Sequence, residues 1–87
     1  MNDFTFTKEA FSQYMYWQVQ DKKTLKKINK LLKEICRTPY EGEGKPEPLK
    51  YKGNNIWSRR INQYDRLVYI VNEGNIEIIQ CKGHYNE

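Results

Sequence analysis

The segment 44–50, with the sequence Gly-Lys-Pro-Glu-Pro-Leu-Lys, holds one carboxylate between two prolines. Because proline fixes its own φ angle and excludes the preceding residue from the helical region, we expect Glu47 on a rigid, extended backbone. Lys45 and Lys50 flank it. A carboxylate fixed among cations can act as a general base. The alternative is a stiff connecting loop with a solvated glutamate, and the spacing alone favours that alternative.

Three further side chains are candidates for chemistry. His84 is the only histidine, and imidazole exchanges protons near neutral pH, although a lone histidine near the end of a chain is more often a plain surface residue. Arg60 and Arg66 stand on either side of one expected turn, in neighbouring strands. Two guanidinium groups that converge on one place suit a phosphate oxyanion. Surface arginines paired with carboxylates are an equally good interpretation.

Together, the carboxylate, the arginines, the lysines, the histidine and a tyrosine can cleave RNA without a metal ion. A base deprotonates the ribose 2′-hydroxyl, cations stabilise the phosphorane, and an acid protonates the leaving 5′-oxygen. The sequence has no acidic or Cys/His cluster typical of a metal site, no glycine-rich phosphate loop and no Gly-x-Ser-x-Gly motif. We therefore expect neither a metal nor a cofactor.

The composition indicates one domain spanning residues 1–87, with a basic surface. The net charge of +4 and the pI of about 9.1 favour a polyanion or an acidic protein as the partner. Cys36 and Cys81 lack CxxC spacing, so we expect two buried free thiols in a reducing cytoplasm. Neither a signal peptide nor a membrane span is predicted, which favours a cytoplasmic protein with no membrane partner.

The first half of the chain predicts a short strand and two helices. The strand covers residues 4–6, and Thr7 caps a helix that runs to about residue 20. Its apolar stripe suits either a base-stacking platform or, more commonly, a core face: Ala10, Phe11, Tyr14, Met15 and Trp17. Asp21 caps the second helix, which Thr38-Pro39 ends.

The second helix combines an apolar face with a strongly basic one. Leu25, Ile28, Leu32 and Ile35 recur at helical spacing. Seven cations stand on the polar side against one acid, Glu34: Lys22, Lys23, Lys26, Lys27, Lys30, Lys33 and Arg37. Such a run is either a solvated face or a footprint for a phosphate backbone.

The second half predicts an antiparallel meander. We expect strands over residues 49–51, 56–62, 66–71 and 76–82, with turns at 52–55 and 63–65 and a hairpin at Glu73-Gly74. Alternation along residues 57–61 puts Ser58 and Arg60 on one face, and Trp57, Arg59 and Ile61 on the other. The helices must cover one face, so the predicted class is α/β (α+β).

Several motifs, in order, resemble one family. They are Lys-Pro-Glu-Pro-Leu-Lys at 45–50, Trp-Ser-Arg-Arg-Ile at 57–61, Arg-Leu-Val-Tyr at 66–69 and His-Tyr at 84–85, preceded by the basic helix at 26–33 and Arg-Thr-Pro at 37–39. This set resembles the Txe/YoeB toxins of the RelE/ParE superfamily of type II toxin–antitoxin systems, over nearly the whole chain. The sequence departs from the family pattern in the turn 51–55, in the residues Asn86-Glu87 after His-Tyr, and in the first strand, where Phe6 stands in for a tryptophan.

The resemblance implies a RelE-like fold, in which two N-terminal helices pack on one face of a twisted, mainly antiparallel sheet of four or five strands. It also implies a ribosome-dependent mRNA endonuclease that a YefM-like antitoxin neutralises, with a homodimer possible. Glu47 would be the general base, His84 the general acid, and Arg66 the group that stabilises the phosphorane. Supporting or positioning roles on the substrate RNA would fall to Lys45, Lys50, Arg59, Arg60 and Tyr85.

The seven cations of the second helix would meet ribosomal RNA on the 70S ribosome. Two other interpretations stay open. One is a non-catalytic toxin of the same fold that acts by binding, as ParE-type toxins bind gyrase. The other is a plain RNA-binding module, for which the charge alone would suffice.

Overall fold

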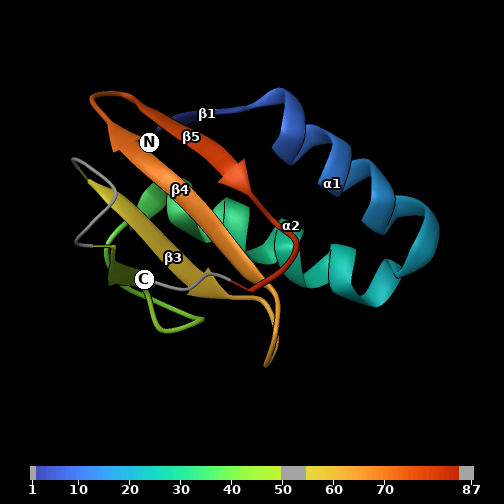
Figure 1. Ribbon diagram of the computed structural model, residues 1–87. Coiled ribbons are helices and arrows are strands. Elements are labelled where there is room, and N and C mark those ends of the chain that lie inside the picture. The colour runs from blue at the N-terminus through green and yellow to red at the C-terminus, as the bar shows by residue number, and fades with distance from the viewer. Residues whose placement is uncertain (1, 50–54, 85–87) are drawn as a thin grey trace.

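The computed structural model describes residues 2–49 and 55–84, which form two helices on one face of a five-stranded sheet (Figure 1). The elements in chain order are β1 (Asp3–Phe6), α1 (Lys8–Gln20), α2 (Lys22–Arg37), β2 (Glu47–Pro48), β3 (Ile56–Arg60), β4 (Arg66–Asn72) and β5 (Asn75–Gln80). The strand order is β1-β5-β4-β3-β2. β1 runs parallel to β5 and the other pairs are antiparallel, which confirms the predicted fold class.

Side-chain caps set the ends of both helices, as the sequence predicted. The Thr7 side chain accepts a hydrogen bond from the Ala10 amide at the start of α1. Asp21 ends α1 through its backbone and begins α2 by accepting bonds from the backbone and the hydroxyl of Thr24. These bonds lower the pKa of the Asp21 carboxyl. A single residue therefore fixes the sharp turn between the two helices.

The core lies between α2 and the central strands. Ile28, Leu31 and Ile35 of α2 are fully buried with Leu67, Tyr69, Ile76 and Ile78 of β4 and β5. The thiols of Cys36 and Cys81 are buried and free, as expected. Neither of the helices in the described ranges is long and apolar enough to span a membrane.

The apolar stripe of α1 is only partly core, and in this respect the prediction was wrong. Ala10 and Trp17 are buried and Tyr14 packs against the core, but Phe11 is 52% exposed and Met15 44% exposed. The reason is that α1 lies toward the β1–β5 end of the sheet, as Figure 1 shows, so neighbouring elements cover only one of its sides.

The strands differ from their predicted bounds mainly at their ends. β3 stops at Arg60 and β5 at Gln80, each two residues early. Leu49 is buried and donates its amide hydrogen to the Ile56 carbonyl at 2.8 Å, so it continues the pairing of β2 with β3 without being part of the strand. The rest of the predicted strand 49–51, and all of the turn 52–55 except Asn55, lie outside the described residues.

Candidate active site

The strand register gathers the candidate residues on the face of the sheet that the helices leave open. Glu47 pairs with Ser58 across β2 and β3, and Arg60 pairs with Arg66 across β3 and β4. Paired residues of antiparallel strands project to the same face. Leu67 and Tyr69 alternate with Arg66 and belong to the core, so Glu47 and the two arginines project away from the helices. Arg60 and Arg66 are thus paired in neighbouring strands, as expected.

Glu47 is exposed on β2, the edge strand beside β3. Its partner Ser58 is two residues from Arg60, a separation of about 7 Å along the strand. The Arg60 amide donates to the Gly44 carbonyl at 2.6 Å, which holds the chain before β2 against β3. Lys45, in this segment, is exposed and has a positive φ angle of 51°. The predicted extended backbone at Glu47 is therefore present and tied to the strand that carries Arg60.

Arg66 is held by backbone carbonyls. Its guanidinium donates to the carbonyls of Asn62 at 3.0 Å and Asp65 at 3.2 Å. Within residues 2–49 and 55–84, no carboxylate forms an ion pair with Arg60 or Arg66. The guanidinium groups of Arg60 and Arg66 can therefore bind an anion from outside these segments.

His84 lies at the same end of the sheet because the chain after β5 returns to β4. The Arg66 amide donates to the Gly83 carbonyl at 2.9 Å, and the Gly83 amide donates to the Asp65 carboxylate at 2.8 Å. The exposed imidazole then lies near the Tyr64 ring, with centroids 5.6 Å apart, and its Nδ1 is 3.3 Å from the Tyr64 carbonyl oxygen. Arg66 and His84 are far apart in sequence, and the backbone hydrogen bond between Arg66 and Gly83 brings them together.

Two predicted site residues, Lys50 and Tyr85, lie outside the described residues. Apart from Lys45 and Arg59, the others fall into three groups: an exposed carboxylate, an arginine pair with a histidine at one sheet end, and the cations of α2. Among the described residues, no group of His, Cys, Asp and Glu side chains is arranged to hold a metal ion.

The predicted role of Arg59 on the substrate RNA was wrong, because its side chain is fully buried and cannot contact RNA. Its guanidinium donates to Glu34 Oε1 at 2.6 Å, to the Thr38 carbonyl at 2.6 Å and to the Glu41 carbonyl at 2.9 Å. It also donates to the Tyr69 hydroxyl at 3.1 Å. Arg59 projects to the core face with Trp57 and Ile61, so its role is to bind the segment 38–43 to the sheet.

Three further residues complete this network, and no role was predicted for them from the sequence: the fully buried Tyr69 and the partly exposed Glu34 and Glu43. Glu34 accepts a second bond from the Glu43 amide at 2.7 Å, and Tyr69 donates to the Pro39 carbonyl at 2.7 Å. Burial raises the pKa of the Tyr69 hydroxyl although Arg59 acts in the opposite direction. The one feature of the sequence that could have indicated this network is Glu34, the single acid among seven cations on α2.

The cations of α2 do not form one uniform surface. Lys27 and Lys30 both form ion pairs with Glu43, and the Lys27 contact is the main reason why the pKa of the Glu43 carboxyl is lowered. The remaining five are exposed: Lys22, Lys23, Lys26, Lys33 and Arg37. Part of the predicted ribosome-contact surface is thus occupied by an internal contact with the segment that leads to Glu47.

Comparison with known proteins decides the family. The family model described as YoeB-like toxin of bacterial type II toxin–antitoxin systems matches residues 6–85. The chain belongs to this family. YoeB toxins of Escherichia coli K12 and Streptomyces coelicolor are 49% and 43% identical to it, over 92% and 93% of this chain and 95% and 96% of theirs. It is therefore a toxin of a type II toxin–antitoxin system.

Solved structures of YoeB toxins share the whole fold. The YoeB/ParE toxin of Agrobacterium tumefaciens superimposes with a TM-score of 0.91 at 41% identity, over 95% of this chain and 99% of that one. The YoeB dimer of Staphylococcus aureus gives 0.89 at 50% identity, over 97% and 98%. A Staphylococcus aureus YoeB–YefM heterotetramer contains a toxin that gives 0.87 at 50% identity, over 98% and 99%. The YoeB fold is thus complete in this chain from β1 to β5.

Proposed function

We propose that this YoeB-like toxin is a metal-independent endoribonuclease that cleaves translated mRNA on the ribosome and so inhibits translation. The observation that carries the proposal is the grouping of Glu47, Arg60, Arg66 and His84 on the open face and at one end of the sheet. A toxin that acts only by binding gyrase, or a plain RNA-binding module, has no need of a carboxylate and an imidazole beside an arginine pair.

In the proposed reaction, Glu47 removes the proton from a ribose 2′-hydroxyl, and the resulting oxygen attacks the adjacent phosphorus. Arg66 and Arg60 bind the non-bridging oxygens and stabilise the charge of the phosphorane. His84 donates a proton to the 5′-oxygen as the P–O bond breaks. The products are a 2′,3′-cyclic phosphate and a 5′-hydroxyl, and the substrate supplies its own nucleophile.

Residues with supporting roles come from the family resemblance. We propose that Tyr85 positions the substrate and that Lys50 contacts the phosphate. Lys45 is exposed beside β2 and is a further phosphate contact. Arg59 is left out of the RNA-binding set because its guanidinium is buried.

The exposure of Glu47 and His84 supports a need for the ribosome. An open surface does not hold a flexible RNA strand in the in-line geometry that the attack requires. A ribosome that presents mRNA in a fixed conformation can supply this orientation. The exposed cations of α2 are suited to ribosomal RNA phosphates, which provide affinity without sequence choice. This target implies action in the cytoplasm.

Two partners follow from the relatives. The Staphylococcus aureus toxin forms a complex with YefM and also a dimer. We propose that a YefM-like antitoxin neutralises this toxin and that the toxin can form a homodimer. No membrane partner is proposed.

The test is to express the toxin in bacteria and to map mRNA 5′ ends relative to the reading frame. We expect new 5′-hydroxyl ends inside translated regions, none in untranslated ones, and no new ends with Glu47→Gln. Growth arrest without new ends, accompanied by DNA damage signalling, would instead identify a gyrase-binding toxin.

A further inference from the structure

The turn between β3 and β4 presents an exposed aromatic ring at the candidate active site. Tyr64 is 63% exposed, and its ring lies beside the His84 imidazole, with centroids 5.6 Å apart and planes tilted by 30°. Arg60 ends β3 and Arg66 begins β4 on either side of this turn. Most of the Tyr64 ring is therefore available to pack with a flat partner.

Hydrogen bonds hold the backbone of this turn in place. Asn62 Oδ1 accepts from the amides of Tyr64 at 2.8 Å and of Asp65 at 2.7 Å. Asn62 Nδ2 donates to the Asp65 carboxylate at 2.9 Å, and the Ile61 amide donates to the Asp65 carbonyl at 3.0 Å. None of these four bonds uses the Tyr64 side chain. The turn thus fixes where the ring begins, and the ring itself is free to serve another purpose.

The backbone of Tyr64 also determines which nitrogen of His84 can reach the substrate. His84 Nδ1 is 3.3 Å from the Tyr64 carbonyl oxygen. Because a carbonyl oxygen only accepts hydrogen bonds, Nδ1 carries the proton of this contact and Nε2 is left to exchange a proton. In the proposed reaction, Nε2 protonates the 5′-oxygen of the nucleoside that follows the scissile phosphate. The base of that nucleoside is attached to the same sugar, so it lies close to His84 and to the Tyr64 ring.

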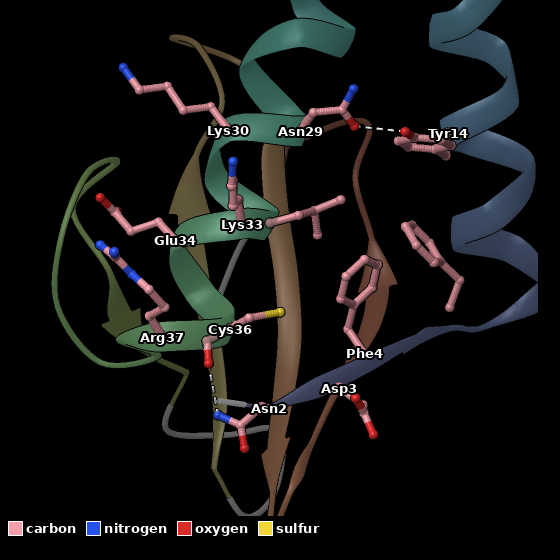
Figure 2. Close-up of a pocket in the computed structure, with 12 residues that line it drawn as sticks. Asn2, Asp3, Phe4, Tyr14, Asn29, Lys30, Lys33, Glu34, Cys36 and Arg37 are labelled. Atoms are coloured by element: carbon pink, nitrogen blue, oxygen red, sulfur yellow. Dashed lines mark hydrogen bonds between the residues drawn. The ribbon is translucent and has the colours of Figure 1, made fainter.

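Phe4 and Phe11 are exposed aromatic rings of another kind, at the edge of the core. Both pack edge-on against Phe6, with centroids 5.9 and 6.1 Å apart, and Phe6 in turn packs against the core. Figure 2 shows Phe4 beside a cavity of about 900 Å³ between β1, α1 and α2. The Tyr64 ring packs instead against the imidazole of the candidate general acid. A place at the edge of the core therefore does not explain the exposure of Tyr64.

We propose that the Tyr64 ring is a stacking surface for the base of the nucleoside that follows the scissile phosphate. This inference rests on the proposed ribonuclease activity and adds a substrate-binding residue to it. Every base has a π face, so an aromatic side chain binds single-stranded RNA with little regard to sequence. Arg60 and Arg66 beside the ring suit the phosphate of the same nucleotide, which favours RNA over a purely apolar partner. The substrate is then held on both sides of the oxygen that His84 protonates.

The test is single-turnover cleavage on programmed ribosomes with two mRNAs, after the cleavage position has been mapped. The mRNAs differ only in the nucleoside that follows the scissile phosphate, which carries its base in one and is abasic in the other. We expect the wild-type toxin to cleave the abasic mRNA about 10- to 10²-fold more slowly. Tyr64→Leu should show a loss of this size on the ordinary mRNA and little further loss on the abasic one, because the stack is already absent. Tyr64→Phe keeps the ring and should retain the dependence on the base.

Phe11→Leu is the matched control, because it removes a 52% exposed aromatic ring from α1. It should show the same dependence on the base as the wild-type toxin, and urea unfolding verifies that each variant folds. If Tyr64→Leu slows cleavage of both mRNAs by the same factor, the ring acts only through His84 and the inference is overturned.

Two other results would also overturn the inference. One is cleavage of the ordinary mRNA by Tyr64→Leu at the wild-type rate. The other is a loss of ribosome binding by Tyr64→Leu while the dependence on the base stays intact, since Tyr64 would then contact ribosomal RNA. If the wild-type toxin cleaves neither mRNA, the proposed ribonuclease activity is itself wrong and the role of Tyr64 falls with it.

Discussion

Arg59 shows how a charged side chain can be structural in a protein that acts on a polyanion. Its guanidinium is fully buried, and its donors meet Glu34, Tyr69 and backbone carbonyls of the segment 38–43. The planar fork of arginine suits several acceptors in fixed directions. This residue therefore ties α2, β3, β4 and the segment that leads to Glu47 into one unit.

Arg59→Ala should destabilise the toxin by about 3 kcal/mol or more, because the Glu34 carboxylate and several carbonyls lose their donor. Arg59→Lys should also destabilise it, because an ammonium cannot reproduce the fork. Urea denaturation measures both, with the exposed Arg60→Ala as the control, for which we expect a change of about 0.5 kcal/mol or less. Equal urea midpoints for the two alanine variants would contradict a structural role.

The thiols of Cys36 and Cys81 should be unreactive in the folded toxin. Burial raises the pKa of the Cys81 thiol to about 12 and raises that of Cys36 in the same direction. Since the thiolate is the reactive form, Ellman's reagent should react slowly at pH 8 and rapidly with two thiols after denaturation in urea. Fast reaction of both thiols in the native protein would contradict their burial.

The same burial predicts a loss of stability in alkali. The folded-state pKa of Cys81 is raised above the ordinary 9.0, so the unfolded chain ionises first as pH rises. The contribution of this thiol to stability is therefore complete below about pH 9 and declines from there toward pH 12. Urea midpoints measured from pH 8 to 10.5 should fall less in Cys81→Ala than in the parent protein.

At the scale of elements, the placement of β2 depends on a glycine. Gly44 has a φ angle of +86°, and a Cβ there would lie 2.9 Å from the Arg60 carbonyl oxygen and 3.1 Å from Arg59 Cβ. The close approach lets the Arg60 amide reach the Gly44 carbonyl. The segment carrying Glu47 thus stays against β3 only if position 44 lacks a side chain.

Gly44→Ala should therefore displace β2 and reduce both stability and cleavage. Gly74→Ala is the matched control, because Gly74 also has a positive φ, +74°, but a Cβ added there would meet no described atom within 4 Å. We expect the control to lose about 1 kcal/mol from backbone strain alone, and Gly44→Ala to lose distinctly more. Similar urea midpoints and cleavage rates for the two variants would contradict the close packing.

The elements also show what the sequence could and could not predict. Thr7 and Asp21 were identified correctly because a cap depends on residues three positions away. The exposure of Phe11 and Met15 was not predicted, because helical spacing defines a face but not which neighbour covers it. Arg59 was placed on the correct face with Trp57 and Ile61, yet its partners are 10 to 25 positions away in the sequence, and no local pattern reveals them.

At the scale of the whole molecule, the candidate active site is a product of topology. Glu47 and His84 are far apart in sequence and reach the open face and one end of the sheet through separate backbone contacts, with β3 and with the start of β4. The sequence predicted that Arg60 and Arg66 lie in neighbouring strands, since one turn separates them. His84 could be named as a candidate because it is the single histidine, but its position beside Arg66 could not be predicted, because nothing local indicates that the chain after β5 returns to Arg66.

The most direct test of the proposed mechanism is single-turnover cleavage of mRNA in a programmed ribosome. Glu47→Gln keeps the shape and removes the base, and His84→Gln removes the acid. Each should cleave about 10²- to 10⁴-fold more slowly than the parent while binding ribosomes equally well. Arg66→Lys should also cleave more slowly, because it loses the bidentate fork. If Glu47→Gln and His84→Gln both cleave at close to the parent rate, the acid–base assignment is wrong, and the reaction depends on substrate orientation and arginine charge alone.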